Sequence, residues 1–355
     1  MRARIERTLT RAWTRRGVLA WLLLPLAAPY AVASALRNGL YATGLLRPFR
    51  AVRPVVVVGN LYAGGAGKTP LVIELVRELR ARGWHPGVVS RGYGRRGTDV
   101  IPVGAESRAA DVGDEPLLIA QRAAVPVVVG ADRVAAARVL LSLHPSCDLI
   151  VCDDGLQHLR LARDFEIAVL HANGLGNGWL LPAGPLRDPP SRLRKVDAVV
   201  LNGDVAAVRV DRPVFRMNSE LGDVYALAQP ARRAPLSMLV QEQRERGTRV
   251  VAAAGIAEPE RFFVLLRAAG LAFEALALPD HAGFAADTFA RREFDVALVT
   301  EKDAVKCREV AALKSDGRLC VASLQTRIEP GLIDLIESRI RRGNAAPPSD
   351  GSPPA

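Results

Sequence analysis

The sequence predicts an α/β fold: a P-loop NTPase-type parallel sheet domain, a second, smaller α/β domain, and an N-terminal membrane-associated helix. First, the β-branched run 55–58 leads into a glycine-rich turn that ends in Gly67-Lys68-Thr69. Second, short apolar runs alternate with helical stretches, as in parallel sheets with helices on both faces. Third, residues 17–36 carry no formal charge and are long enough to span the hydrocarbon core of a bilayer.

The chain is long enough for two domains with separate cores, because it has 355 residues of which 49% are hydrophobic. The C-terminal residues are rich in proline, serine and alanine and have little to bury. We therefore expect four parts: a basic and apolar membrane anchor (1–50), the P-loop domain (51–215), the smaller α/β domain (216–340) and a disordered tail (341–355).

Most of the positive charge lies near the N-terminus. The net charge is +11, and residues 1–53 contribute +9 of it through ten arginines and the single acid Glu6. Basic residues beside an apolar segment favour anionic lipid headgroups, each contributing about 1 kcal/mol near the surface. Aromatic residues make up only 5% of the chain, which disfavours a base-stacking surface. We expect an anionic membrane surface as a partner, and no nucleic acid.

Three alternatives exist for residues 17–36. Ala31-Val32-Ala33 resembles a signal-peptide cleavage site, but cleavage would export a triphosphate-binding domain to a compartment without ATP. A spanning helix conflicts with arginines on both flanks, which the positive-inside tendency holds on one side. Pro25 and Pro29 are expected to break the helix into short pieces. A monotopic, interfacial anchor satisfies all of these constraints and is favoured.

The turn after the first strand is a predicted phosphate-binding loop. Its backbone N–H groups converge on the phosphates, Lys68 reaches the β and γ oxygens, and the Thr69 hydroxyl is placed to ligate Mg²⁺. The strict motif has glycine where this chain has Tyr62, but the strand and the apolar helix pattern stand where the motif needs them. The predicted ATP-binding residues are Gly64, Gly65, Ala66, Gly67, Lys68 and Thr69.

Two sets of strands are predicted from apolar runs. The first set comprises residues 55–58, 86–90, 125–129, 149–152, 167–170 and 198–201. The second set comprises residues 250–253, 272–277, 296–299 and 319–322. Between the sets we expect an irregular stretch over residues 203–235. The four cysteines (Cys147, Cys152, Cys307 and Cys320) show no C-x-x-C spacing and are expected to be reduced core residues.

The strand 149–152 ends in two carboxylates, Asp153 and Asp154. A P-loop fold needs an acid at this position to hold the Mg²⁺ that Thr69 also contacts, so we expect one of the two to serve the metal. Gln157 and His158 follow within one turn and are placed to face the same cleft.

Three further polar clusters suit a site. Ser90-Arg91-Gly92-Tyr93-Gly94 follows a strand, Gly113-Asp114-Glu115-Pro116 opens a helix, and Pro279-Asp280-His281 lies in a polar loop. On local evidence alone, the carboxylates at the helix start fit a helix cap equally well, and an isolated loop histidine is usually solvated.

Taken in order, these motifs resemble the tetraacyldisaccharide 4'-kinase (lipid A 4'-kinase) family over roughly residues 13–335. The departures are Tyr62 where the family usually has a small hydroxyl residue, Leu156 where phenylalanine is frequent, and Asp188 where glutamate is general. Besides the P-loop with Gly59-Asn60, the resemblance covers Ser90-Arg91-Gly92-Tyr93-Gly94, Gly113-Asp114-Glu115-Pro116, Gly130-Ala131-Asp132-Arg133, Asp153-Asp154-Gly155-Leu156-Gln157-His158, Leu181-Pro182-Ala183-Gly184-Pro185-Leu186-Arg187, Pro279-Asp280-His281 and Thr300-Glu301-Lys302-Asp303-Ala304-Val305-Lys306-Cys307.

The resemblance implies transfer of the ATP γ-phosphoryl group to the 4'-hydroxyl of a tetraacylated glucosamine disaccharide 1-phosphate, with ATP and Mg²⁺ bound. It implies a bacterial inner-membrane enzyme with its active site facing the cytoplasm, and no obligatory protein partner. The implied catalytic residues are Asp114 as base, His281 as its orienting partner, and Lys68. The implied metal residues are Thr69, Asp153, Asp154 and Glu115, and the implied substrate or phosphate contacts are Arg91, Tyr93, Arg133, Gln157, His158 and Arg187.

Two other functions compete with this one. A membrane-recruited switch ATPase carries a lysine at the start of its P-loop signature, where this chain has Ala63. A lipid-binding protein with a relict nucleotide fold would have to retain Lys68, Thr69, Asp114 and Asp153 without using them. We therefore favour the lipid kinase over both.

Overall fold

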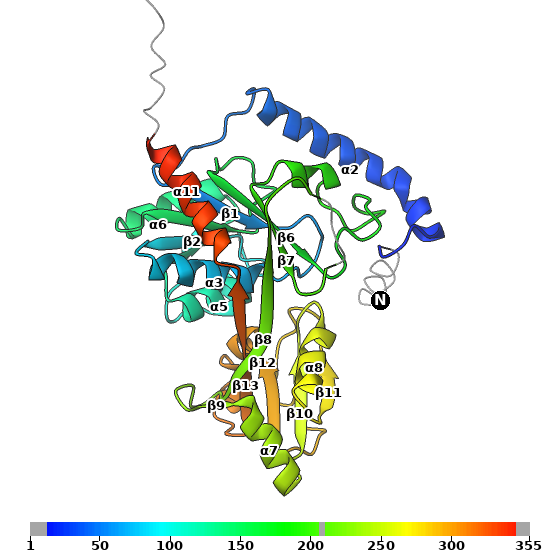
Figure 1. Cartoon of the computed structure of the whole chain (residues 1–355). Helices are drawn as coiled ribbons and strands as arrows, with labels where there is room; N and C mark the ends of the chain where they lie inside the picture. Colours follow the sequence, from blue (N-terminus) through cyan, green and yellow to red (C-terminus); the bar gives the residue numbers. More distant parts are fainter. Residues whose placement is uncertain (1–12, 206–209, 346–355) are drawn as a thin grey trace, which may run out of the picture.

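The computed structural model describes residues 13–205 and 210–345 of the chain. Within these residues the strands form one continuous sheet in the order β11-β10-β12-β13-β8-β7-β6-β1-β5-β2-β4-β3, with β9 paired to β8 (Figure 1). The strands are β1 (Val55–Gly59), β2 (Pro86–Ser90), β3 (Ile101–Pro102), β4 (Val127–Val129), β5 (Leu149–Asp153), β6 (Phe165–His171), β7 (Ala198–Asn202), β8 (Val214–Ala226), β9 (Arg233–Pro235), β10 (Val250–Ala254), β11 (Glu274–Ala277), β12 (Val296–Thr300) and β13 (Leu319–Ile328).

Strand β1 is central to the P-loop part and pairs in parallel with β5 and β6. Its side chains alternate between the two faces of the sheet, as a strand requires. Val56 and Val58 pack toward helix α3 (Lys68–Ala81), whereas Val55 and Val57 pack toward helix α6 (Arg133–Leu143). Each of the six strands predicted here is confirmed to within two residues. The carboxyl ends of β1, β2, β5 and β7 therefore lie along one edge of the sheet.

The second part repeats the pattern around the parallel strands β10, β11, β12 and β13. Helices α7 (Leu236–Arg246) and α8 (Pro259–Ala268) cover one face, and α9 (Glu301–Cys307) and α10 (Ala311–Lys314) cover the other. Helices α4 (Ala109–Val112) and α5 (Asp114–Ala123) belong to the P-loop part, and a short 3-10 helix spans Pro190–Arg194. The four strands predicted for the second part are confirmed, but the last, predicted over 319–322, continues to Ile328.

The irregular stretch predicted for residues 203–235 is wrong, because it contains the 13-residue strand β8. Polar residues interrupt the strand pattern here, and Met217, Val224 and Tyr225 are its buried side chains. Strand β8 pairs in parallel with β7 at one end and antiparallel with β13 along the rest. The two long strands run from the P-loop part into the second part (Figure 1). A single pair of strands thus joins the two parts.

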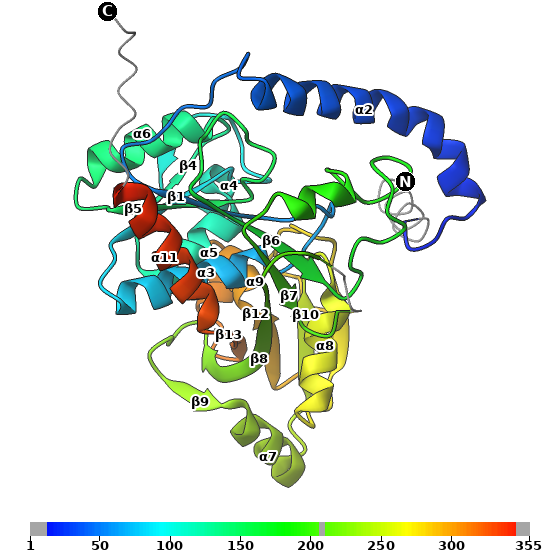
Figure 2. The same ribbon diagram turned by 45° about the horizontal axis from the view of Figure 1, so that its top comes forward.

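The last helix, α11 (Gly331–Ala345), returns to the P-loop part and lies beside α3 (Figures 1 and 2). Its buried side chains Leu332, Ile333, Ile336 and Ile340 belong to the same core as β1 and α3. The first five residues of the predicted tail, 341–345, are therefore helical, because α11 continues through them. The rest of the tail lies outside the described residues.

The apolar N-terminal segment forms one helix, α2 (Val18–Ala42), which lies along the outside of the molecule (Figure 2) and contacts it through Trp21 and Tyr30. The expected break at Pro25 and Pro29 is wrong, since both prolines lie inside this helix. Each proline removes one backbone hydrogen bond, and a helix can continue through such a site by bending. By length and composition, α2 is the one helix in the described chain that is able to cross a membrane. All four cysteines are free, and three of them are buried as predicted, whereas Cys320 is only half-buried.

Candidate active site

The P-loop turn lies between β1 and α3 and requires glycine at one position. Gly67 has a φ of 83°, and a Cβ there would lie 2.0 Å from Nδ2 of Asn202. That amide in turn donates a hydrogen bond to the carbonyl oxygen of Ala66 at 3.0 Å. Helix α3 begins directly after the turn, at Lys68, so its first N–H groups and its dipole face the turn. This is the geometry of a phosphate-binding site.

Tyr62 occupies the first glycine position of the motif without entering the turn. Its side chain is only 5% exposed, and its ring packs edge-on against His171 with ring centroids 4.8 Å apart. The backbone at Tyr62 pairs with Leu186, from the segment that ends in Arg187. The larger residue therefore packs under the turn and leaves it open.

Lys68 and Arg187 both contact Asp154. Nζ of Lys68 lies 3.5 Å from Oδ1 of Asp154, and Nη1 of Arg187 lies 3.1 Å from Oδ2. Both cations also donate to Oδ1 of Asn60, Lys68 at 3.2 Å and Arg187 at 2.5 Å. Burial alone would raise the pKa of Asp154, but Lys68 and Arg187 lower it to about 2. Asp154 is thus a fixed negative charge beside the P-loop lysine.

Asp153 has one carboxylate oxygen held and one unpaired. Oγ of Ser90 donates to its Oδ2 at 2.9 Å, whereas the buried Oδ1 has no hydrogen-bond partner. Burial, and then the charges of Glu115 and Asp154, raise its pKa to about 7. An orphaned carboxylate oxygen beside further acids is a place where a divalent cation would be stabilised.

These residues fit Mg²⁺ rather than a metal held by protein ligands alone. Residues 13–205 and 210–345 contain no cluster of three or more His, Cys, Asp or Glu side chains arranged to hold a metal ion. Mg²⁺ is usually bound through one or two carboxylates, with waters and substrate phosphates completing the shell. The Thr69 hydroxyl and the unpaired oxygen of Asp153 are two oxygen donors that such a site could use.

Asp114 and His281 meet across the two parts of the molecule. Asp114 opens α5, and its Oδ2 lies 3.0 Å from Nδ1 of His281, which follows β11 in the second part. Burial would raise the pKa of Asp114, but the hydrogen bond from His281 and the charge of Lys302 lower it. The same hydrogen bond raises the pKa of His281. Both shifts favour the charged forms of the pair, a carboxylate and an imidazolium.

Lys302 lies beside the Asp114–His281 pair. Its Nζ lies 3.0 Å from Glu115, 3.5 Å from Asp280 and 3.8 Å from Asp114. Burial would lower the pKa of Lys302, but the three carboxylates raise it. Glu115 is thus paired with Lys302 in this structure, close to the position predicted for the metal.

The other residues predicted to contact substrate or phosphate divide into two groups, and the first lies close to the residues described above. Gln157 lies in the cluster and donates to Asp188 at 2.7 Å, while Arg187 donates to Gln157 at 3.3 Å. The ring of Tyr93 lies 5.3 Å from that of His281.

The second group makes no side-chain contact with Asp153 or Asp154, although Arg133 donates to the backbone carbonyl oxygen of Asp154 at 3.4 Å. Arg133 is buried and donates to the Ala131 carbonyl oxygen at 3.0 Å, and His158 lies 3.8 Å from Asp132. The side chain of Arg91 is exposed.

Sequence reasoning gave no role to Asn60, Asn202 or Lys302. Asn60 follows β1 directly and Asn202 ends β7, so both stand at the carboxyl ends of parallel strands. Polar residues at that edge of an α/β sheet are a signal for a binding site. Lys302 lies one residue past the start of α9, where its charge alone gave no indication of its partners.

A cavity of about 590 Å³ lies between the two parts of the molecule. One wall is the P-loop, Gly65 to Pro70, with Glu115 and Arg122 of α5. The opposite wall comes from the second part and includes the residues Ile256, Ala257, Glu258, Arg261, Phe262, Leu265, Thr300, Glu301 and Lys302. The cavity is large enough for a nucleotide, and both charged and apolar side chains line it.

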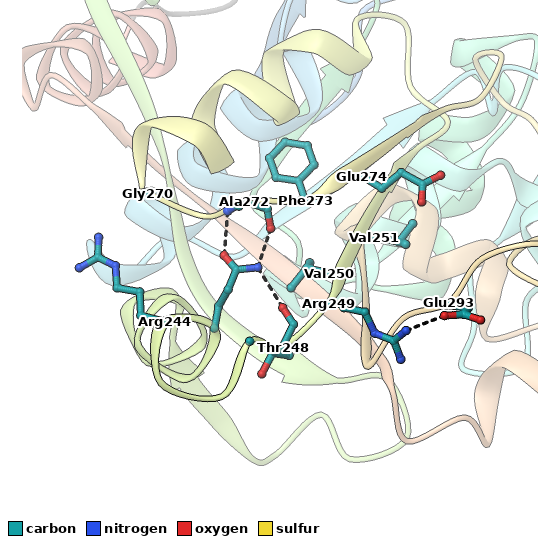
Figure 3. Close-up of a pocket in the computed structure, with 12 residues that line it drawn as sticks. Arg244, Thr248, Arg249, Val250, Val251, Gly270, Ala272, Phe273, Glu274 and Glu293 are labelled. Carbon is teal, nitrogen blue, oxygen red and sulfur yellow. Dashed lines mark hydrogen bonds and ion pairs between the residues drawn. The ribbon is translucent and has the colours of Figure 1, made fainter.

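A second hollow lies in the second part, between α7, β10 and the end of α8 (Figure 3). Its rim carries exposed polar side chains, and Arg249 donates to Glu293 there at 2.8 Å. The hollow contains none of the residues predicted for the site. The P-loop cavity, which several of the predicted residues line, is therefore the candidate active site.

Comparisons with known proteins show the family of the chain. The sequence model described as tetraacyldisaccharide-1-P 4'-kinase matches residues 19–341. The chain belongs to this family. It is 48% identical to the tetraacyldisaccharide 4'-kinase of Janthinobacterium sp. (strain Marseille) over 96% of this chain and 97% of that one. It is 47% identical to the enzyme of the same name from Herminiimonas arsenicoxydans, again over 96% and 97%.

A solved structure of this family has the same fold. The crystal structure of the "apo" form of LpxK from Aquifex aeolicus in complex with ATP has a TM-score of 0.77 and 29% identity. The alignment covers 91% of this chain and all of that one. The predicted α/β P-loop fold is therefore confirmed.

Membership of the family also confirms the predicted enzyme class. The tetraacyldisaccharide-1-P 4'-kinases transfer phosphate to a hydroxyl group of a lipid A precursor, so this chain is a lipid kinase and the switch ATPase is not favoured. The lipid substrate of the family and the apolar helix α2 associate the chain with a membrane.

Proposed function

We propose that this kinase transfers the γ-phosphoryl group of ATP to the 4'-hydroxyl of a tetraacylated glucosamine disaccharide 1-phosphate, with Asp114 as the base. The observation that carries the proposal is the 3.0 Å contact between Asp114 and His281, beside the cavity that the P-loop lines. A base oriented by a second group and placed near the phosphate site is what a kinase requires of its side chains.

The nucleotide is held by Gly64, Gly65, Ala66, Gly67, Lys68 and Thr69, as the turn geometry and the cavity support. Thr69, Asp153, Asp154 and Glu115 would hold Mg²⁺, and the unpaired oxygen of Asp153 is the strongest support for that assignment. When bound, Mg²⁺ offsets negative charge on the phosphates. Lys68 has a similar effect on the β and γ oxygens.

Proton transfer is assigned to Asp114. As the bond between the 4'-oxygen and the γ-phosphorus forms, the bond to the β–γ bridging oxygen breaks, and the hydroxyl proton passes to a carboxylate oxygen of Asp114. His281 holds that carboxylate in place, and the low pKa of Asp114 keeps it ionised at neutral pH. Because the pair spans both parts of the molecule, closure of the cavity would precede chemistry.

The phosphorylated lipid is assigned to the side of the site where α2 lies. Oη of Tyr30, on α2, donates to the backbone carbonyl of Arg187 at 2.8 Å, which links the helix to the Asp154 cluster. We assign substrate or phosphate contacts to Arg187, Gln157, Arg133, His158, Arg91 and Tyr93.

Helix α2 is assigned as a monotopic anchor. It exposes a large apolar surface that includes Val18, Trp21, Leu22, Leu26, Val32 and Leu36. A helix of this kind lies in a membrane interface when basic residues flank it. We propose that it binds the cytoplasmic leaflet of the bacterial inner membrane, so that the active site faces the cytoplasm and ATP.

The division into a P-loop domain, residues 51–215, and a smaller domain, residues 216–340, remains part of this proposal. The separate cores on either side of β8 and β13 support it. Helix α11 is the exception, because it packs on the P-loop part.

The experiment that tests the function is transfer of radiolabelled γ-phosphate from ATP to the purified acylated disaccharide 1-phosphate in detergent micelles. Labelled lipid that is absent with Lys68→Ala would support the lipid kinase. Lipid-independent ATP hydrolysis without labelled lipid would contradict it and favour the switch ATPase.

A further inference from the structure

Four cationic side chains line the P-loop cavity: Lys68 and Arg122 from the P-loop part, and Arg261 and Lys302 from the second part. Three of them are tied to acidic partners. Lys68 lies 3.5 Å from Asp154, Lys302 lies 3.0 Å from Glu115, and Arg122 donates to the buried carboxylate of Glu301. These pairs leave Arg261 as the cation to consider.

Arg261 is only loosely held. Its Nη1 lies 3.8 Å from Oε2 of Glu258, which is beyond hydrogen-bond distance. The two side chains are 44% and 37% exposed, and such a pair contributes little stability. The guanidinium of Arg261 can therefore turn toward a new anion at small cost.

The backbone that carries Arg261 is firmly placed against the P-loop. A Cβ built on Gly65 would lie 3.2 Å from Cβ of Ala257, so the segment that leads into α8 touches the phosphate-binding turn at Ala257. The segment is held from behind, because the Gly255 N–H donates to Asp303 at 2.9 Å and Lys306 donates to the Gly255 carbonyl oxygen at 3.4 Å. Arg261 then stands in the first turn of α8.

The surroundings of the buried His171 ring are also consistent with Arg261 lying near the P-loop turn. The ring packs on Tyr62 under the P-loop turn. Burial, and then the charges of Arg261 and Lys68, lower its pKa to about 4. The two cations, from the two parts of the molecule, thus act on one place beside the turn.

We propose that Arg261 is a catalytic residue of this kinase that contacts the γ-phosphoryl group from the second part of the molecule, opposite Lys68. The inference rests on the proposed function. As the bond to the bridging oxygen breaks and the bond to the 4'-oxygen forms, negative charge spreads over the phosphoryl oxygens, and an arginine aimed at them stabilises it. The planar guanidinium binds two of these oxygens at once and takes up no proton.

The test compares Arg261→Ala, Arg261→Lys and a matched control, Arg246→Ala. Arg246 forms a similarly loose helix pair, 3.5 Å from Glu242, on α7 and away from the cavity. Dissociation constants for ADP and for a non-hydrolysable ATP analogue are measured by calorimetry, and kcat by phosphate transfer to the lipid. Arg261→Lys keeps the positive charge, and it replaces Arg261→Ala as the test variant if the alanine variant does not fold.

We expect Arg261→Ala to weaken analogue binding about tenfold, to leave ADP binding unchanged and to lower kcat at least a hundredfold. Arg261→Lys restores part of the affinity and less of kcat, because it lacks the two-pronged contact. The proposal would be overturned if Arg261→Ala weakened the binding of ADP and of the analogue equally, or weakened the binding of neither. If the unaltered chain labels no lipid, the proposed function fails, while the ADP and analogue comparison still decides the role of Arg261.

Discussion

Nδ1 of His281 lies 3.0 Å from Oδ2 of Asp114, although 167 residues separate them in the sequence. Asp114 begins helix α5 beside the P-loop, and His281 is held with a φ of 58° in the loop after β11. A non-glycine residue seldom adopts this conformation, and such residues concentrate at functional sites. Through this contact, a residue of the second part of the molecule orients the Asp114 carboxylate of the P-loop part.

Asp114→Asn should remove the base while leaving the nucleotide site intact. We expect kcat to fall by about 10²- to 10⁴-fold, because general base catalysis contributes that much. ATP binding should be unchanged, since Asp114 does not form the P-loop turn. His281→Gln should also lower kcat, but by less, because the carboxylate remains. Single-turnover phosphate transfer and calorimetric ATP titration separate the two effects.

The matched control for this pair is Asp111→Asn, an exposed carboxylate on α4 three residues earlier. It should leave kcat unchanged. Near-normal turnover by Asp114→Asn would show that another group takes the proton.

Lys302→Met should destabilise the molecule, because three carboxylates, Glu115, Asp280 and Asp114, would then face one another without a cation. Breaking a buried pair typically costs 3–5 kcal/mol, and partial exposure of Glu115 and Asp280 reduces this to about 2 kcal/mol. The loss should be smaller at pH 4 than at pH 7, since protonation relieves the repulsion. Urea unfolding at both pH values measures it, with the exposed Lys314→Met as the control. An equal loss at both pH values would contradict the charge argument.

The pH dependence of folding provides a separate test at His171. Its pKa is about 4 in the folded chain and about 6.5 when unfolded, so the unfolded state binds more protons between these values. Stability should therefore fall as pH drops from 6.5 to 4, by on the order of 3 kcal/mol from this residue. His171→Gln should flatten the slope in that window, whereas the exposed His85→Gln should not. Thermal unfolding between pH 4 and pH 7 measures the stability of each variant. If stability falls equally with pH in His171→Gln and in the unaltered chain, the assignment of the pH dependence to His171 is refuted.

The strands of the P-loop part could be predicted because their residues are apolar and β-branched in short runs. Val55 to Val58, for example, are buried on both faces, so sequence and structure agree. Strand β8 could not be predicted in this way, because it bridges two cores and leaves residues such as Arg216 and Glu220 largely unburied. Its polar residues match neither a buried strand nor a half-buried one.

The site shows the same division between local and long-range information. The glycine-rich turn and the Asp153-Asp154 pair each lie within one strand–turn unit, so spacing alone located them. The approach of His281 and Lys302 to Asp114 depends on how β8 and β13 join the two parts. No local pattern encodes that crossing, and only the family resemblance paired Asp114 with His281.

Ile336→Ala should destabilise the P-loop part, although Ile336 follows the second part in sequence. Its side chain is fully buried in the core that contains β1 and α3. Deleting such a side chain costs about 2–5 kcal/mol through lost burial and the cavity left behind. At the end of α3, Arg82 and Trp84 donate to Glu337 at 2.9 and 2.8 Å, which holds α11 in place. Urea unfolding monitored at Trp84 should show the loss, and an unchanged midpoint would mean that α11 does not dock in solution.

Leu22→Ser combined with Leu26→Ser should weaken membrane binding without harming the fold. Both leucines lie on α2 and are 70% and 62% exposed, so they stabilise little within the chain itself. If their side chains enter the lipid interface, each contributes about 1.5–3 kcal/mol, and the double change should reduce partitioning into anionic vesicles by at least about a hundredfold. ATP binding should not change, whereas transfer to lipid in vesicles should fall. Met238→Ser removes an apolar side chain of similar exposure, 59%, from α7 and serves as the control. If the double variant still sediments with vesicles as the unaltered chain does, then α2 is not the anchor, and the arginine-rich segment before it would have to hold the kinase at the membrane alone.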